Sequence, residues 1–220
     1  MTEPDEHVAV LVSGGLDSAV LCIDLLRDFH RVTPLFVRSG LRWESVELES
    51  LRRFLDAVNS AALDPLVVLD EPIADVYGPH WSTTGNNVPG ADTEDAAVYL
   101  PGRNLLLAVK AAIWCRLKGL QALALGSLGS NPFPDSTPAF FRQLEGLLSL
   151  ALSGSPRLIR PFASLHKSDV IKRGRELPLN YTFSCINPMD GRHCGACNKC
   201  AERKQGFHEA GVADLTLYAS

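Results

Sequence analysis

The feature that most constrains the fold is a regular alternation of short apolar runs with longer amphipathic segments. Runs of strand length occur at residues 8–12, 32–37, 65–70, 120–126 and 157–162. Segments with apolar residues at helical spacing occur at residues 17–29, 43–59, 104–117, 139–152 and 167–176. Strands that alternate with helices over short connections form a parallel sheet covered by helices. The sequence therefore predicts an α/β fold, an open parallel five-stranded sheet flanked by helices.

Charge and composition argue against several classes of protein. The chain has 220 residues, a net charge of −4 and no dense run of lysine and arginine, whereas proteins that grip a phosphate backbone are usually more basic. Residues 1–10 begin polar and acidic, which is not the pattern of a secretory signal. No stretch approaches the ~20 consecutive apolar residues that cross a bilayer. We expect a cytoplasmic protein with no membrane segment and no stable nucleic-acid partner.

The junction of the first strand and first helix reads S-G-G-L-D-S, from Ser13 to Ser18. Two glycines after a buried strand let the backbone approach a ligand closely, because a Cβ would block that approach. The helix that follows directs unpaired backbone N–H groups at the same place, which favours an anion. The hydroxyls of Ser13 and Ser18 can add donors. Asp17 fits if a cation such as Mg²⁺ lies beside the anion, or if it caps the helix.

Two familiar nucleotide-binding loops do not match this junction. A Walker A loop would need its lysine, and the glycine spacing fails the dinucleotide pattern G-x-G-x-x-G. The junction resembles instead the pyrophosphate-binding loop S-G-G-x-D-S of the ATP pyrophosphatase group. That resemblance implies that the loop holds the β,γ-diphosphate of ATP while a substrate oxygen attacks the α-phosphorus. A glycine turn that merely joins strand to helix is the structural alternative.

Four cysteines gather in the tail. Three of them form C-x-x-C-x-x-C and the fourth lies a short loop upstream, and four thiolates close in sequence suit tetrahedral Zn²⁺. His193 competes for one ligand position, and an iron–sulfur cluster is the alternative to zinc. We expect a domain of residues 1–180 and a zinc-binding element of residues 181–220. The proposed ligands are Cys185, Cys194, Cys197 and Cys200. The remaining two, Cys22 and Cys115, lie in apolar helical patterns and are expected in the core.

Other polar residues follow strands or begin helices. Arg103 and Asn104 open a helix after a Pro-Gly turn, where a helix N-terminus and a cation would attract phosphate. Lys167 follows the fifth strand, and Asp135 lies in a proline-rich loop after the fourth. Ligand sites of open α/β sheets form at these strand ends. The alternatives are that Arg103 and Lys167 are ordinary surface residues and that Asp135 only forms a turn. Residues 71–101 form a loop long enough to suggest a function.

With these pieces in order, the chain resembles the QueC family of 7-cyano-7-deazaguanine synthases. The matching motifs are S-G-G-L-D-S, P-G-R-N, P-D, the lysine of HKSDVI and the cysteine-rich tail, so the resemblance covers nearly the whole chain. It implies a ligase that adenylates 7-carboxy-7-deazaguanine with ATP, replaces AMP with ammonia, and converts the amide to the nitrile with a second ATP. It also implies Mg²⁺, structural Zn²⁺ and a homodimer.

The resemblance assigns roles to individual residues. Nucleotide binding falls to Ser13, Gly14, Gly15, Leu16, Asp17, Ser18, Arg103 and Lys167. Of these, the residues expected to be catalytic are Ser13, Asp17, Ser18, Arg103 and Lys167. Asn104 and Asp135 are expected to bind the deazapurine substrate.

One loop departs from the family pattern. At residues 131–140 the Pro-Asp is kept, but Ser136, Thr137 and Ala139 replace the Cys, Arg and Glu that are typical of the family. This loop lies where the substrate should be recognised. The resemblance therefore supports the adenylation chemistry more firmly than it supports the identity of the substrate. QueC-like proteins also occur in anti-phage gene clusters, where a protein amine could take the place of ammonia. A tRNA-modifying ATP pyrophosphatase and a non-catalytic nucleotide-binding scaffold are further alternatives.

Overall fold

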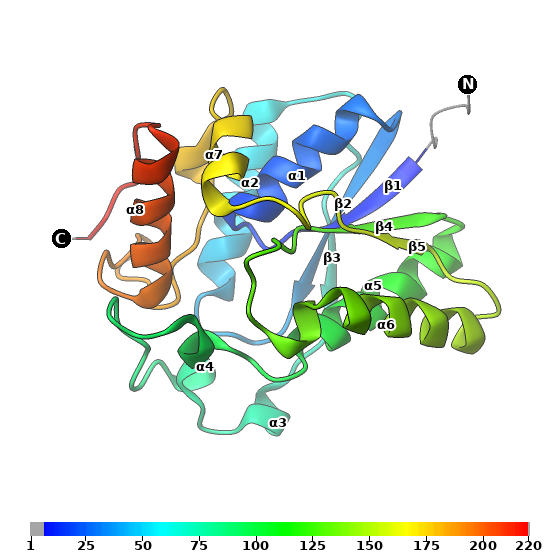
Figure 1. The fold of residues 1–220 in the computed structure, drawn as a ribbon, viewed down its shortest axis with the longest axis horizontal. Coiled ribbons are helices and arrows are strands. Elements are labelled where there is room, and N and C mark those ends of the chain that lie inside the picture. Colours follow the sequence, from blue (N-terminus) through cyan, green and yellow to red (C-terminus); the bar gives the residue numbers. More distant parts are fainter. Residues whose placement is uncertain (1–6, 220) are drawn as a thin grey trace.

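The computed structural model describes residues 7–219 (Figure 1). The polar residues 1–6, on which the expectation of no secretory signal partly depends, lie outside them. Within the described chain, five parallel strands form one sheet in the order β3-β2-β1-β4-β5, which confirms the expected fold. The strands are β1 (His7–Leu11), β2 (Arg31–Arg38), β3 (Val67–Asp70), β4 (Ala122–Leu125) and β5 (Arg157–Ile159).

Helices cover both faces of this sheet (Figure 1). One face carries α1 (Leu16–Asp24), α2 (Glu44–Val58), α7 (Lys167–Arg173) and α8 (Asn198–Ala210). The other carries α5 (Arg103–Lys118) and α6 (Pro138–Ala151). Along β1, Val8 and Val10 pack toward the first group while Ala9 packs toward the second, because successive strand residues point to opposite faces. The sheet therefore lies buried between two apolar layers.

The central strand β1 pairs with β2 on one side and β4 on the other. The chain leaves β1 toward β2 and returns only later to β4, so the strand order reverses at this point. A crevice forms at the carboxyl ends of strands where the order reverses, and ligands of open α/β sheets bind there. The S-G-G-L-D-S junction follows β1 at that edge.

The segment at residues 71–101 is more ordered than a plain loop. It contains two short helices, α3 (Ala74–Tyr77) and α4 (Trp81–Thr84), and a 3-10 turn, Asp95–Val98. Its backbone joins the cysteine-rich tail, since the Ala91 N–H donates to the Ala196 carbonyl at 3.0 Å. The Asn198 N–H likewise donates to the Pro89 carbonyl at 3.0 Å. The segment therefore connects the sheet edge to the tail.

Helix α8 is an element that the sequence did not predict. Its buried side includes Arg203, which is 2% exposed and donates to Thr182, Thr216 and the Leu179 carbonyl. A charged residue on the buried side of a helix conceals its apolar periodicity. The division of the chain at residue 180 stays a prediction. In residues 7–219, no helix combines the length and apolar character needed to cross a membrane.

Candidate active site

The junction after β1 forms a tight loop that only glycine can make at one position. Gly14 has a φ of +81°, and a Cβ there would lie 2.5 Å from the backbone carbonyl oxygen of Glu47. The Phe183 N–H donates to the Gly14 carbonyl at 2.8 Å, which fixes the loop from the other side. The loop is therefore held between α2 and the chain that leads into the tail.

The two serines of this loop hold each other. The Ser13 N–H donates to Ser18 Oγ at 3.1 Å, and Ser18 Oγ donates to the Gly15 carbonyl at 3.2 Å. The Gly15 N–H donates to Ser13 Oγ at 3.2 Å. No side chain caps α1 at Gly15, so the first backbone N–H groups of α1 stay available for an anion. Ser18 thus stabilises the loop, and both serines also line cavity space beside it.

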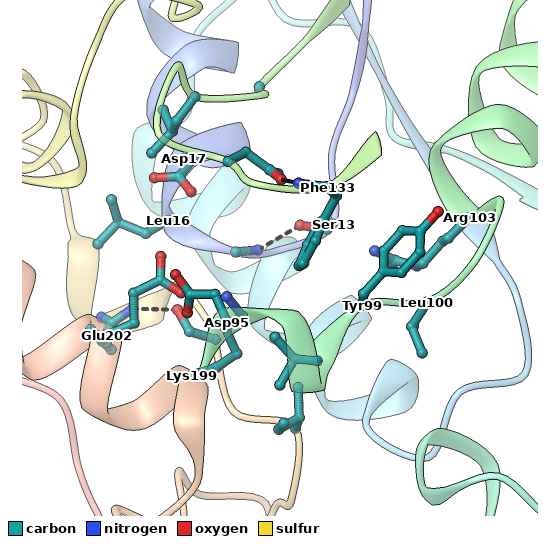
Figure 2. Close-up of a pocket in the computed structure, with 18 of the residues that line it drawn as sticks. Ser13, Leu16, Asp17, Asp95, Tyr99, Leu100, Arg103, Phe133, Lys199 and Glu202 are labelled. Atoms are coloured by element: carbon teal, nitrogen blue, oxygen red, sulfur yellow. Dashed lines mark hydrogen bonds and ion pairs between the residues drawn. The ribbon is translucent and has the colours of Figure 1, made fainter. Parts of the chain in front are cut away.

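Two adjoining cavities open at this loop. The larger has a volume of about 300 Å³ and the smaller about 200 Å³, and both are lined by Ser13, Gly15 and Asp17. The larger also brings together expected site residues that are far apart in the sequence. These are Leu16, Arg103, Asn104, Asp135 and Lys167. Figure 2 shows several of its lining side chains, with Ser13, Asp17 and Glu202 around the opening.

Asp17 is balanced by a lysine in this structure. Lys167 Nζ lies 2.5 Å from Asp17 Oδ2 and 3.0 Å from Glu202 Oε1, and Lys199 Nζ lies 2.5 Å from Glu202 Oε2. Burial opposes the charge on Lys167, but the two carboxylates outweigh it and raise its pKa. Burial likewise opposes the charge on Glu202, but the two lysines lower its pKa to about 2. Lys167 and Glu202 are therefore both charged at neutral pH.

The start of α5 supplies a second cation. Arg103 lines both cavities, and its Nε is buried without a partner among the described residues. Asp135 accepts from the Asn104 N–H at 3.1 Å and from Asn104 Nδ2 at 3.2 Å. Asp135, which is 6% exposed, thus binds the first turn of α5 and orients Asn104.

Glu47 is a cavity residue that the sequence did not reveal, because it looks like one more charge on an amphipathic helix. It is 8% exposed and lines both cavities. Burial raises its pKa to about 8, although the nearby Arg103 opposes the shift. Its neighbour Glu44 has a structural role: it accepts from the N–H groups of Ser39 and Gly40. Glu47, unlike Glu44, lines the larger cavity as well as the smaller.

Aromatic residues form another wall of the larger cavity, and sequence analysis missed them as a group. Trp43 and Trp81 stack with ring centroids 5.7 Å apart and an interplanar angle of 14°. Tyr99 and Phe133 lie 5.1 Å apart (Figure 2). Trp81 and Tyr99 come from the segment at residues 71–101, so this segment lines the larger cavity.

The loop that departs from the family pattern contributes its first half to the cavity. Asn131, Pro132 and Phe133 line the larger cavity together with Asp135. Among the described residues, Ser136, Thr137 and Ala139 line neither cavity. Thr137 instead caps α6, where its Oγ1 accepts from the Phe140 N–H at 3.1 Å. The substituted residues therefore shape the entry into α6.

The four tail cysteines form one buried cluster whose sulfur atoms all lie within 4.8 Å of one another. The Sγ atoms of Cys185 and Cys197 are 3.8 Å apart. Backbone N–H groups of Asn187 and Cys194 donate to Cys185 Sγ at 3.3 and 3.2 Å. His193 is not a member, because its Nε2 accepts from the Ser184 N–H at 3.0 Å. The cluster can hold a metal ion.

The other two cysteines lie in the core as expected. Cys22 and Cys115 are fully buried, on opposite faces of the sheet. Burial raises the pKa of each thiol to about 12. Since the thiolate is the reactive form, neither is a nucleophile at neutral pH.

Comparisons with known proteins agree with these features. The 7-cyano-7-deazaguanine synthase of Anaeromyxobacter sp. (strain Fw109-5) is 32% identical over 234 residues, covering 98% of this chain and 97% of its own length. That of Azoarcus sp. (strain BH72) is 34% identical, covering 96% of each chain. The solved structure of the U34-tRNA thiolase NcsA from Methanococcus maripaludis with its [4Fe-4S] cluster has a TM-score of 0.52 and 13% identity. It covers 97% of this chain and 75% of that one, which shows the fold alone.

The family model agrees with the curated relatives. The model described as "Queuosine biosynthesis protein QueC" matches residues 7–211, which include the Ser13–Ser18 loop and all four tail cysteines. The chain belongs to the QueC family.

Proposed function

We propose that this protein is an ATP-dependent ligase that converts 7-carboxy-7-deazaguanine and ammonia to 7-cyano-7-deazaguanine. The observation that carries the proposal is that two cavities meet at one phosphate-binding loop. Adenosine in the smaller cavity would place the α-phosphate of ATP at Ser13–Ser18. A carboxylate in the larger cavity would then face that phosphorus.

The proposed chemistry takes four steps. A carboxylate oxygen attacks the α-phosphorus, the bond to the β-phosphate oxygen breaks, and pyrophosphate leaves. Ammonia attacks the acyl carbon, loses a proton and expels AMP, which gives the amide. The amide oxygen then attacks the α-phosphorus of a second ATP and releases a second pyrophosphate. Loss of the amide nitrogen's remaining protons and of AMP leaves the nitrile. Adenylation thus turns a poor leaving group into a good one, twice.

The loop and the cations around it have distinct roles in this proposal. The N–H groups at the start of α1 bind the β- and γ-phosphates, which do not move to the substrate. Lys167 and Arg103 stabilise the charge that builds on pyrophosphate. The Oδ1 of Asp17 is buried and has no partner within residues 7–219, which suits Mg²⁺, because Mg²⁺ prefers carboxylate oxygens. Bound there, Mg²⁺ would neutralise phosphate charge.

Aromatic side chains and Glu47 would recognise the deazapurine. Planar bases stack on aromatic rings, and the Trp43–Trp81 pair lines the larger cavity. Glu47 lies in the same cavity, and its carboxyl can form hydrogen bonds with a guanine-like edge. Asn104 and Asp135 support this end through the first turn of α5.

We propose Zn²⁺ for the cysteine cluster. Zinc–sulfur bonds of about 2.3 Å in a tetrahedron place sulfur atoms about 3.8 Å apart. The Cys185–Cys197 and Cys194–Cys200 distances are 3.8 and 4.0 Å. A four-iron cluster would hold its thiolates farther apart. Elemental analysis is expected to find one zinc per chain and no iron, and iron with visible absorption would contradict the assignment.

The test of the function is a product assay. Purified protein is incubated with MgATP, 7-carboxy-7-deazaguanine and ¹⁵N-ammonium, and products are followed by mass spectrometry. We expect a ¹⁵N-labelled nitrile with two AMP and two pyrophosphate per turnover. An amide that accumulates, or AMP release only when a protein amine is added, would contradict nitrile formation and favour the protein-acceptor alternative. Absence of AMP with this substrate would contradict the ligase itself.

A further inference from the structure

Helix α8 carries a glycine where a helix usually has a side chain. Gly206 lies in the interior of α8, where glycine is less favourable than alanine. Its backbone does not require glycine, since it is not among the described glycines with positive φ. A Cβ at Gly206 would lie 2.6 Å from Lys167 Cγ and 3.0 Å from Ile171 Cδ1. The glycine therefore makes room for the first turn of α7, and for the stem of Lys167 in particular.

One helical turn earlier, α8 supplies a carboxylate for the same lysine. Residues four apart lie on the same face of a helix, so Glu202 and Gly206 face Lys167 together. Glu202 Oε1 is 3.0 Å from Lys167 Nζ, and its second oxygen is held by Lys199. Asp17 Oδ2 contacts the ammonium group from the loop side at 2.5 Å. The whole length of the lysine side chain is thus constrained, stem by Gly206 and head by two carboxylates.

This constraint matters because lysine is a flexible side chain whose charge must be placed. An ammonium group has three N–H donors. Asp17 and Glu202 take two of them, which leaves one for a phosphate oxygen in the cavity. Without Glu202 the head would be held by Asp17 alone, and with a Cβ at residue 206 the stem would be displaced.

We propose that α8 is a positioning element of the nucleotide site, in which Gly206 admits the stem of Lys167 and Glu202 fixes its ammonium group. The cysteine-bearing element then has a second task besides holding a metal ion, because it sets the location of a phosphate-binding cation. The inference rests on the proposed role of Lys167 in binding ATP.

The first variant is Gly206→Ala, with Gly146→Ala as its matched control. Gly146 lies within α6, and a Cβ there would meet nothing within 4 Å. We expect Gly206→Ala to raise the KM for ATP at least tenfold and to lower kcat, with the zinc content unchanged. Gly146→Ala is expected to leave both constants within twofold of wild type. Equal kinetics of Gly206→Ala and wild type would overturn the proposal.

The second variant is Glu202→Gln, which keeps an oxygen acceptor but removes its charge. Glu202→Ala removes both, so the expected order of ATP affinity is wild type, then Gln, then Ala. Gln205→Ala, on the exposed side of the same helix, controls for damage to α8. A structural role alone would lower the melting temperature of these variants without this order in KM. These variants test the proposal even where Gly206→Ala does not fold.

The rise in melting temperature that MgATP alone induces separates this inference from the proposed reaction. If MgATP stabilises wild type, and stabilises Gly206→Ala and Glu202→Ala much less, α8 positions Lys167 whatever the product is. If MgATP stabilises all three equally, the positioning role is overturned while the ligase proposal stands. If MgATP does not stabilise wild type, the nucleotide site itself is wrong and this inference fails with it.

Discussion

At the end of the larger cavity formed by Ser13–Ser18, the proposed phosphate end, backbone N–H groups and charged side chains line the space, whereas aromatic side chains form another wall. The phosphate end is built from the loop after β1 and closed by ion pairs among Asp17, Lys167 and Glu202. The aromatic wall is assembled from Trp43 just before α2, the segment at residues 71–101 and the loop after β4. If the proposed function holds, the difference teaches that activation of the substrate depends on backbone shape and charge, while choice of substrate depends on side-chain surfaces.

The largest expected effect comes from breaking the phosphate end. Gly14→Ala would place a Cβ 2.5 Å from the Glu47 carbonyl oxygen at a positive φ. Since the loop cannot keep its shape, we expect AMP formation to fall by about 10²–10³, the range seen when preorganised donors are lost. AMP release with saturating deazapurine measures this. Wild-type rates in a folded Gly14→Ala variant would contradict the account of the loop.

A smaller effect is expected from the aromatic wall. Trp81→Ala removes the ring that stacks on Trp43, and base stacking contributes about 1–3 kcal/mol. The KM for the deazapurine should rise roughly 5- to 150-fold, while the KM for ATP stays near wild type. Tyr181→Ala, exposed and outside both cavities, serves as the control. A rise in the KM for ATP alone would reverse the assignment of the two ends.

Glu47, which borders both cavities, gives a pH-dependent prediction. Its pKa is raised by burial from 4.5 to about 8, so the folded state favours the protonated carboxyl more than the unfolded state does. This contribution to stability is fully present below about pH 4.5 and is lost as the pH rises through 8. The glutamine of Glu47→Gln cannot ionise. The melting temperature of this variant, relative to that of wild type, should therefore rise between pH 5 and pH 9.

Thermal melts at several pH values measure this gain. Glu49→Gln is the matched control, because it makes the same change on the exposed side of α2. A difference between Glu47→Gln and wild type that stays constant from pH 5 to pH 9 would show that the carboxyl does not titrate in this range.

The smallest effect is expected at Thr137, which caps α6 outside both cavities. Thr137→Ala should lower the free energy of unfolding by about 1 kcal/mol, the usual loss for a helix N-cap. Its kcat and both KM values should stay within twofold of wild type. Asn131→Ala, in the same loop but on the cavity, should instead raise the KM for the deazapurine. An equal rise in the KM for the deazapurine in both variants would contradict the assignment of Asn131 to the cavity and of Thr137 to the helix cap alone.

The same contrast explains what could be predicted from the sequence. The loop from Ser13 to Ser18 is continuous in the chain, so its residue types and its position between strand and helix can be read directly. The four cysteines are visible for the same reason. The parallel sheet follows from the alternation of strands and helices. The observed strand ends differ from the predicted ones by only a few residues. At β5 the strand stops at Ile159 because Pro161 has no N–H to donate.

The aromatic wall and Glu47 could not be predicted because their partners are remote in the sequence. Gly14 packs against the backbone of Glu47, and nothing near residue 47 signals that contact. Trp43 and Trp81 meet only after the segment at residues 71–101 folds over the sheet edge. In α8 the buried face includes Arg203, so the hydrophobic period that reveals other helices is interrupted. Contacts between distant segments, rather than local pattern, decide these parts of the site.

The most direct test of adenylation uses 7-carboxy-7-deazaguanine with ¹⁸O in both carboxylate oxygens. Attack of a carboxylate oxygen and then of the amide oxygen on the α-phosphorus transfers one ¹⁸O to each AMP. We predict that both AMP molecules of a turnover carry one ¹⁸O, that pyrophosphate carries none, and that the nitrile forms in equal amount to the substrate consumed. Unlabelled AMP, or ¹⁸O in pyrophosphate or inorganic phosphate, would contradict activation of the substrate at the α-phosphorus.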